Sequence, residues 1–454
     1  MTKLNHKSLP EREAEVAHFE RAGKWDANKL SVADRPVHDW YRFVLSFPPH
    51  LVRTYIDRFE LNGNHLVLDP FCGTGTTIVE CKKLGIPSVG FEANPMALFA
   101  SQVKTTWKLD PGGLVEHARQ VAVRVKRKLH STGFLEPGAP LFASNDLDHE
   151  ERSKLLKLPP ETNKLLLGNS ISPIPLHKTL LLFGYLSKDS SSPYHRHELL
   201  ALAKALVTTI GNLHFGPEVG VGPPKMDAPV INSWFANVAK MADDLVALQG
   251  NRETAAKAFF SDSRKETKSL RGRYVDAVIT SPPYPNEKDY TRTTRLESVI
   301  LGLIRTKQDL RAFKTALLRS NTRNVYKGDK DDEWISSHRE IQGIADEIEA
   351  RRIALGKTSG FERLYAKVTK LYFGGMARHL TVIRKYLRPG AKLAYVVGDQ
   401  ASYLRVLIRT GRILADLAET LGYEVVGLDL FRTRLATATR EQLREEVLVL
   451  RWPG

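Results

Sequence analysis

The stretch HLVLDPFCGTGTT, residues 65–77, decides the expected fold. Residues 65–68 form a short apolar run that predicts a buried strand, and residues 77–84 have the pattern of a helix. The loop between them contains Gly73 and Gly75. Glycines at the start of a helix let backbone N–H groups approach a ligand, because no side chain is in the way. The stretch therefore predicts a strand, a ligand-binding turn and a helix.

Further strand and helix patterns occur in two separate parts of the chain. Strands are predicted at residues 87–91, 274–279 and 391–397, with a closing pair at 423–428 and 446–450. Helices are predicted from about Pro95, at about 366–387 and at about 404–421. Arg388-Pro389-Gly390 is expected to end the second of these helices. Strands that alternate with helices are typical of a parallel sheet covered by helices, so the sequence predicts an α/β fold.

Two stretches interrupt this alternation, and we interpret them as insertions. Residues 110–255 contain a basic helical run at 119–130, a segment rich in proline and serine at about 170–193, and a Gly/Pro tract at 215–229. Residues 301–364 are charged and mostly helical in pattern. The length of 454 residues then describes one split domain with inserts.

Composition limits the classes of protein that the chain can represent. The content of 42% hydrophobic and 26% charged residues excludes a disordered, collagen-like or membrane-spanning chain, and a net charge of +16 favours a polyanionic partner. Cys72 and Cys81 are too few for a disulfide framework and lack metal-ligand spacing, so we expect a reducing compartment and no metal. Residues 1–20 are charged and have no signal-peptide pattern, which predicts a soluble, cytoplasmic protein without a membrane contact.

The residues around the glycine loop limit the classes of ligand that the loop can bind. A nucleotide-triphosphate loop requires a lysine that is absent here, and a dinucleotide fingerprint requires a third glycine where the chain has Ile78. Asp69 precedes the loop, and Glu92 ends the next predicted strand, where a carboxylate can bind both hydroxyls of a ribose. The pattern favours a nucleoside with a positive or neutral tail over a simple tight turn.

DPFCGTGTT (residues 69–77) and EANP (92–95) resemble motifs I and II of the S-adenosylmethionine-dependent amino-methyltransferases that act on DNA. The resemblance implies a Rossmann-like class I methyltransferase sheet. It also implies the residues that contact the cofactor: Asp69, Phe71, Gly73, Gly75 and Thr76 at the methionine end, and Glu92 at the ribose. FPPH (47–50) is similar to motif X, which places Pro48 at the methionine end. Ser261-Asp262-Ser263 resembles motif III, which places Asp262 at the adenine; a helix N-cap is the alternative.

TSPPY, residues 280–284, follows a predicted strand directly and resembles motif IV of the same family. An exocyclic amino group needs hydrogen-bond acceptors that let its nitrogen become pyramidal. The resemblance assigns this role to Ser281 and the Pro282 carbonyl, with Pro283 stiffening the turn and Tyr284 stacking on a flipped base. Tyr290 is a candidate second wall of the base pocket. A proline-stiffened turn without catalysis is the alternative.

The Ser-Pro-Pro-Tyr variant favours cytosine N4 over adenine N6 as the methylated group, by family analogy. Carbon-5 cytosine methylation is excluded, because it needs a nucleophilic cysteine that neither Cys72 nor Cys81 supplies by position. Two other possibilities stay open: an RNA guanine-N2 methyltransferase, and a non-catalytic subunit that only binds nucleic acid.

The resemblance divides the chain into five parts. They are a cofactor-binding half with motif X (1–109), an insertion (110–255), a half with the catalytic motif (256–300), a second insertion (301–364) and the rest of the sheet (365–454). Double-stranded DNA is the expected partner, and the insertions are the candidate recognition regions. Their basic residues are Arg119, Arg124, Lys126, Arg127 and Lys128, and Arg311, Lys314, Arg319, Arg323 and Lys327. The resemblance leaves open whether a cognate restriction endonuclease belongs to the same restriction-modification system, and which oligomer forms.

Overall fold

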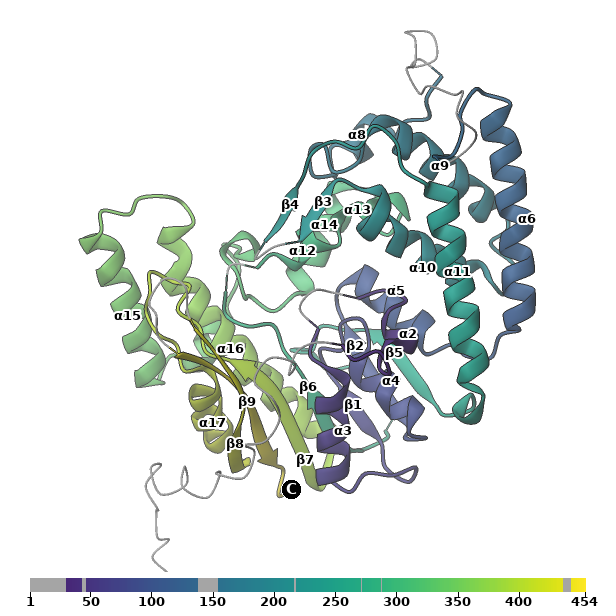
Figure 1. Ribbon diagram of the computed structural model, residues 1–454. Coiled ribbons are helices and arrows are strands. Elements are labelled where there is room, and N and C mark those ends of the chain that lie inside the picture. The colour runs from purple at the N-terminus through teal and green to yellow at the C-terminus, as the bar shows by residue number, and fades with distance from the viewer. Residues whose placement is uncertain are drawn as a thin grey trace, which may run out of the picture.

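The computed structural model describes residues 30–42, 46–137, 154–215, 218–270, 272–286, 288–435 and 442–454. Its centre is a seven-stranded sheet in the order β5-β2-β1-β6-β7-β9-β8 (Figure 1). The strands are β1 (Val67–Asp69), β2 (Ser88–Glu92), β5 (Ala256–Phe260), β6 (Val275–Thr280), β7 (Leu387–Gly398), β8 (Glu424–Leu435) and β9 (Gln442–Arg451). The first five strands of this order run parallel, and β9 pairs antiparallel with both β7 and β8.

The strand order confirms the predicted α/β fold with a Rossmann-like class I methyltransferase sheet. From β1 the chain moves outward on one side to β2 and β5, and then returns to the other side of β1 as β6. In the register, Val67 of β1 pairs with Ser88 of β2 and with Ala277 of β6. The sheet thus has a topological switch point between β1 and β6, where open α/β folds bind ligands.

Alternate residues of the central strands enter two cores on opposite faces of the sheet, as a period of two requires. Val67 of β1 and Ile279 of β6 pack with α3 (Pro49–Arg58). Leu68 and Val278, their neighbours in sequence, pack with α16 (Tyr365–Ile383) and α17 (Thr410–Thr420). The sheet is therefore covered on both faces. The remaining helices of the cofactor half are α4 (Thr76–Lys83) and α5 (Pro95–Lys104).

Residues 110–255 form a mainly helical lobe beside α5 (Figure 1). Its elements are α6 (Pro111–His130), α8 (Pro160–Asn163), α9 (Pro173–Lys188), α10 (His195–Ala205), η2 (Leu206–Ile210), the hairpin β3 (Leu213–Phe215) and β4 (Val219–Val221), α11 (Val230–Ala247) and η3 (Gln249–Asn251). Their apolar faces form one large core that includes the fully buried Trp234. The short helix α2 (Arg35–His38) joins this core.

Between β6 and β7 the chain forms short helices and turns, followed by two long helices. They are α12 (Tyr290–Thr293), α13 (Arg295–Ile300), α14 (Lys307–Ala316), η4 (Thr322–Asn324), η5 (Asp331–Ile335), α15 (Arg339–Ala354), η6 (Glu362–Leu364), α16 and η7 (Arg384–Tyr386). Figure 1 shows α15 and α16 on the opposite side of the molecule from α6, with α12 to α14 in between. None of the helices in the described residues is long and apolar enough to cross a membrane.

Several elements differ from the sequence predictions, each for a local reason. The segment at about 170–193, described from the sequence only as rich in proline and serine, contains helix α9. The helix tolerates Pro173 and Pro175 because they lie in its first turn, where a missing N–H costs no hydrogen bond. α16 ends at Ile383, and Pro389 and Gly390 lie inside β7, where Gly390 N–H donates to the Trp452 carbonyl (2.6 Å). Strand β5 and the hairpin β3–β4 were not predicted. The early segment at 1–20 lies outside the described residues.

The predicted helix at about 404–421 begins later, at Thr410. Leu404 and Arg405 have φ angles of 53° and 65°, in the left-handed region. A right-handed helix cannot contain these angles, so the chain makes a turn before α17.

Candidate active site

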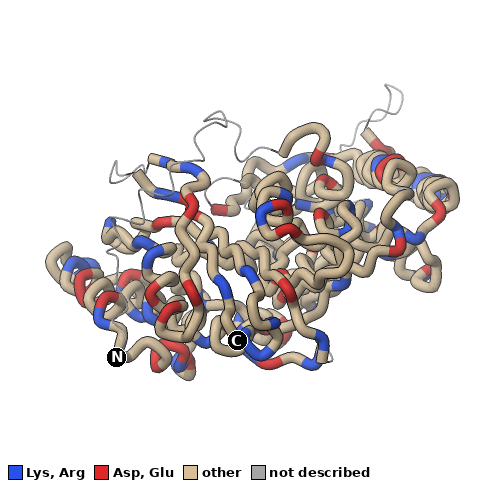
Figure 2. The backbone as a smooth tube through the Cα atoms, turned by 90° about the horizontal axis from the view of Figure 1, so that it is seen from below, with Lys and Arg blue, Asp and Glu red and all other residues tan. Residues whose placement is uncertain are grey.

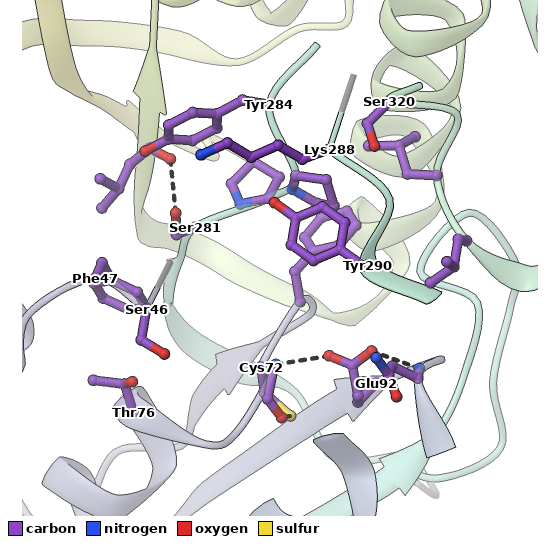
Figure 3. Close-up of a pocket in the computed structure, with 18 of the residues that line it drawn as sticks. Ser46, Phe47, Cys72, Thr76, Glu92, Ser281, Tyr284, Lys288, Tyr290 and Ser320 are labelled. Atoms are coloured by element: carbon purple, nitrogen blue, oxygen red, sulfur yellow. Dashed lines mark hydrogen bonds between the residues drawn. The ribbon is translucent and has the colours of Figure 1, made fainter. Parts of the chain in front are cut away.

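The glycine loop follows β1 and TSPPY follows β6, so the two motifs meet at the switch point of the sheet. They line one cavity of about 520 Å³ at the carboxyl ends of these strands (Figure 3). A cavity of this size suits a cofactor-sized molecule. Most of the predicted site residues line it: Pro48, Phe71, Gly73, Thr76, Glu92, Ser281, Pro282, Pro283, Tyr284 and Tyr290. Asp69, Gly75 and Asp262 are not among the lining residues.

The loop has a backbone that its glycines permit. Gly73 and Gly75 have φ angles of 51° and 90°. Gly75 caps α4, and a side-chain Cβ there would lie 3.0 Å from the Cβ of Ser101. Gly75 is therefore needed for the turn and for close packing of the loop on α5, although it does not reach the cavity.

Glu92 stands at the end of β2 with its carboxylate held by the backbone. Oε2 accepts from the Gly73 N–H (2.7 Å), and Oε1 accepts from the Asn94 N–H (2.6 Å). Burial raises the pKa of Glu92 to about 7, although both N–H groups act in the opposite direction. A carboxylate fixed in this way beside a glycine loop is suited to bind vicinal hydroxyls.

Asp69 lies beneath the cavity and connects the two motifs. Its Oδ1 accepts from the Thr280 hydroxyl (2.6 Å) and from the Phe71 N–H (3.1 Å). Its Oδ2 is buried and has no hydrogen-bond partner in the part of the chain that the structure describes. Burial raises the pKa of Asp69 to about 6. Asp69 thus holds the loop after β1 against the end of β6.

The motif after β6 presents its polar groups to the cavity. Ser281 Oγ donates to the Val396 carbonyl of β7 (3.3 Å) and also interacts with the Tyr284 hydroxyl; a hydroxyl oxygen has two lone pairs that can accept. Tyr284 packs on the end of β7, where a Cβ at Gly398 would lie 2.9 Å from its Cε2. Burial, together with the charge of Glu445, raises the pKa of the Tyr284 hydroxyl. The tyrosine is therefore a neutral, fixed ring in the cavity wall.

The Asp262 carboxylate does not line the cavity and forms an ion pair instead. It binds Arg264 with both oxygens (2.9 Å each), and Arg264 also pairs with Asp331 of η5 (2.7 Å). From this turn, Ser261 and Ser263 line the cavity. The carboxylate predicted to contact the adenine therefore forms an ion pair with Arg264. Through the pair of Arg264 with Asp331, it links the turn after β5 to the second insertion.

Other lining residues were not predicted, and most of them come from distant parts of the chain. They include Glu218 in the hairpin segment, Leu317, Leu318 and Ser320 after α14, Phe431, Arg432, Arg434 and Glu445 on β8 and β9, and Lys288 just after the motif. Residues 431–434 lie beyond the strand predicted at 423–428 and belong to strand β8, which extends to Leu435.

The predicted basic clusters of the insertions have different positions. Those of α6 are exposed, but α6 lies at the outer side of the helical lobe (Figure 1). In the second insertion, Arg319 is buried and binds Asp329 (2.8 Å), and Arg323 pairs with Glu218, which lines the cavity (3.5 Å). Figure 2 shows basic and acidic residues interspersed over the molecule. The arginines nearest the cavity are Arg432 and Arg434.

Among the described residues, no group of three or more His, Cys, Asp or Glu side chains is arranged to hold a metal ion. Cys72 and Cys81 are both buried and free. Burial raises the pKa of both thiols, so neither is a thiolate at neutral pH.

The strand order and the cavity at its switch point define an α/β protein with a class I methyltransferase sheet. A family described as DNA methylase (N6_N4_Mtase) matches residues 11–102, which include the glycine loop and Glu92.

The chain is also similar to individual proteins over most of its length. It is 24% identical to the type II methyltransferase M.BsoBI of Geobacillus stearothermophilus, over 92% of this chain and 84% of that protein. It is 24% identical to the type II methyltransferase M.AvaI of Anabaena variabilis, over 94% and 88%. A shorter match, to the type II methyltransferase M.MjaII of Methanocaldococcus jannaschii, is 35% identical over 18% of this chain and 16% of that protein.

Among solved structures, TrmN of Thermus thermophilus aligns with 92% of this chain at 11% identity and a TM-score of 0.27. The alignment spans about half of that chain (52%).

Proposed function

We propose that the protein is a site-specific DNA methyltransferase that transfers the methyl group of S-adenosylmethionine to an exocyclic amino group of a flipped base, cytosine N4 in preference to adenine N6. The observation that carries the proposal is the shared cavity of the two motifs at the switch point. The similarity to type II methyltransferases over more than nine-tenths of the chain supports it.

The cavity residues suit the proposed cofactor. Glu92 offers carboxylate oxygens for ribose hydroxyls. Pro48, Phe71, Gly73 and Thr76 would hold the methionine end, with the loop backbone as donor. When bound, the cofactor supplies an electrophilic methyl group on its sulfonium.

The residues after β6 would activate the acceptor. Ser281 Oγ, whose hydrogen is directed to Val396, and the Pro282 carbonyl accept hydrogen bonds from the amino group and orient its lone pair toward the cofactor side of the cavity. Tyr284 stacks on the flipped base, and Tyr290 lines the same cavity as a second ring. No covalent nucleophile is needed, because the proposed transfer is direct.

This assignment gives each part of the chain a proposed role. Residues 1–109 and 256–300 supply cofactor and acceptor residues, residues 365–454 complete the sheet, and the insertions at 110–255 and 301–364 are the proposed DNA-reading regions. Residues from both inserted stretches, Glu218 and Ser320, line the cavity. These stretches are therefore near a flipped base and would contact the flanking nucleotides.

The purified protein should be incubated with labelled S-adenosylmethionine and either duplex DNA or structured RNA, and the nucleosides then separated by mass. We expect N4-methylcytosine in DNA. N6-methyladenine would support the adenine alternative, and N2-methylguanosine in RNA would support an RNA enzyme.

The Ser281→Ala variant should lose activity by about 100-fold or more while its cofactor affinity is retained. Binding of cofactor and DNA without transfer by the wild type would identify a non-catalytic subunit instead. Sequencing of modified bases in DNA from expressing cells identifies the recognition sequence.

A further inference from the structure

Lys288 reaches the base end of the cavity from a position just after the catalytic motif. It lies four residues after Tyr284, is half-buried and lines the cavity. Figure 3 shows its side chain extending to the part of the cavity occupied by Ser281 and Tyr284. It is thus a cation in the region where the proposed function places the flipped base.

The backbone of Lys288 is fixed from two sides. Its N–H donates to Asn286 Oδ1 (3.0 Å), and its carbonyl accepts from Asn321 Nδ2 (3.1 Å). Asn321 is fully buried in the turn that precedes η4. The second insertion therefore holds the lysine at the cavity wall, as a positioned side chain rather than a free surface residue.

The ammonium group of Lys288 keeps its donors available. Within the described residues it forms no ion pair closer than 4.0 Å. Burial and the charge of Arg434 lower the pKa of Lys288, and the charges of Glu218 and Glu445 act in the opposite direction. A half-buried ammonium loses part of its hydration, and the loss is recovered when a ligand supplies acceptors. The cavity therefore selects a ligand with acceptor atoms near Lys288.

The two candidate bases differ in the acceptors beside their amino group. Cytosine has N3 next to N4 and O2 beyond it, two acceptors on one edge. Adenine has N1 next to N6, followed by a carbon-bound hydrogen. An ammonium group offers three donors in adjustable directions, so it can serve both acceptors of cytosine and only one of adenine.

We propose that Lys288 is a specificity-determining residue that donates hydrogen bonds to the N3 and O2 edge of the flipped cytosine, and so favours cytosine over adenine. The inference rests on the proposed function, since it assumes that a flipped base enters this cavity. The main competing role for a lysine near DNA is a contact to a backbone phosphate, which carries no base preference.

The test compares Lys288→Met with the wild type on duplexes that carry the mapped recognition sequence. One duplex has cytosine at the target position, one has 3-deazacytosine, which lacks the N3 acceptor, and one has adenine. Lys257→Met, at an exposed position on the edge strand β5, is the matched control. Thermal unfolding and cofactor titration check that each variant is folded and binds S-adenosylmethionine.

We expect Lys288→Met to lower kcat/KM on the cytosine duplex by about 10- to 100-fold, and to lower the preference for cytosine over adenine by a similar factor. On 3-deazacytosine the two enzymes should differ by much less, because the N3 contact is already absent. Lys257→Met should match the wild type throughout.

Two results would overturn the inference. The first is wild-type activity of Lys288→Met on cytosine. The second is an equal loss on all duplexes with a weaker salt dependence of binding, which identifies a phosphate contact. Failure of the proposed function is recognised separately, in the wild type alone: it would modify adenine, or no DNA base, before any variant is compared.

Discussion

At the scale of single residues, Gly398 determines where Tyr284 lies. A Cβ at this position would lie 2.9 Å from Tyr284 Cε2 and 3.3 Å from Glu445 Cγ, closer than packed side chains tolerate. We expect Gly398→Ala to displace the ring and to lower kcat by up to about 100-fold, since a shift of 1 Å in a positioning group has effects of this size. Cofactor affinity should not change, because the glycine loop follows β1, whereas Gly398 ends β7.

Methylation kinetics and cofactor titration measure both effects. Gly343→Ala is a suitable control, because no atom lies within 4 Å of the added Cβ in helix α15. Loss of cofactor binding in Gly398→Ala, or full activity, would contradict the assigned role of Tyr284.

We expect Glu92 to make cofactor binding depend on pH. Its pKa, raised to about 7 by burial, means that the carboxylate is partly protonated at neutral pH before a ligand binds. Ribose hydroxyls donate hydrogen bonds, so they bind the ionised form better. The affinity for S-adenosylmethionine should therefore fall as the pH decreases below about 7, by up to tenfold per pH unit. The cofactor has an amino group that titrates as well, so Glu92→Gln is needed as the reference.

Calorimetric titration of both proteins between pH 6 and 8.5 isolates the contribution of Glu92. Glu92→Gln should bind more weakly at high pH and show a smaller pH dependence than the wild type. Parallel curves for the two proteins would mean that the Glu92 carboxylate does not contact the cofactor.

How far the site could be predicted depends on whether its residues are local in sequence. Ser281 and Tyr284 were predicted as site residues because they follow a strand within four positions, so their placement at the sheet edge needs only the strand itself. The same cavity is lined by Arg432 and Glu445 through the pairing of β7, β8 and β9. It is lined by Lys288 through a contact with Asn321. No local pattern encodes such contacts. The ion pair of Asp262 was not predicted for the same reason, because its partner Arg264 is held by the distant Asp331.

At the scale of elements, the hairpin of β8 and β9 presents cations to the cavity and α6 does not. Arg432 pairs with Glu445 of β9 (2.6 Å), and Arg434 donates to the Asp399 carbonyl (3.2 Å). Both arginines line the cavity, whereas the cations of α6 lie on the outer helix of the lobe. Strand β5 was missed in the sequence because AKAFF has no β-branched residue and Lys257 interrupts its apolar run. The longer, more apolar β7 was predicted.

This placement predicts which element binds the DNA backbone. Replacing Arg432 and Arg434 by glutamine should reduce the slope of log K against log salt by about 2, since each phosphate contact contributes roughly 0.9. Replacing Arg127 and Lys128 of α6 should leave the slope unchanged. Fluorescence anisotropy with a labelled duplex at several salt concentrations measures it. The reverse result would assign DNA binding to the outer face of the helical lobe.

At the scale of the whole molecule, residues 34–42 join three parts of the chain before it enters the cavity wall at Phe47 and Pro48. The Val37 N–H and Trp40 Nε1 donate to Asp244 of α11 (3.0 and 2.8 Å). His38 is bonded to Glu80 of α4 (2.7 Å), and the Tyr41 hydroxyl donates to Glu297 of α13. Because the inserted lobe, helix α4 of the cofactor half and helix α13 after the catalytic motif all bind this segment, the buried acids that contact it couple their stability.

Glu297 makes that coupling measurable, because it is fully buried and burial raises its pKa to about 7. The native state then binds a proton more tightly than the unfolded chain, so the contribution of Glu297 is complete below about pH 4.5 and is lost as the pH rises through about 7. The loss amounts to about 3 kcal/mol.

Glu297→Gln resembles the protonated form at every pH. Its free energy of unfolding should equal that of the wild type near pH 4.5 and exceed it by up to this amount at pH 8. Urea unfolding at several pH values measures the difference, with Glu253→Gln, 78% exposed, as the control that stays at the wild-type value. An advantage that does not grow with pH would mean that Glu297 is ionised and compensated in the native protein.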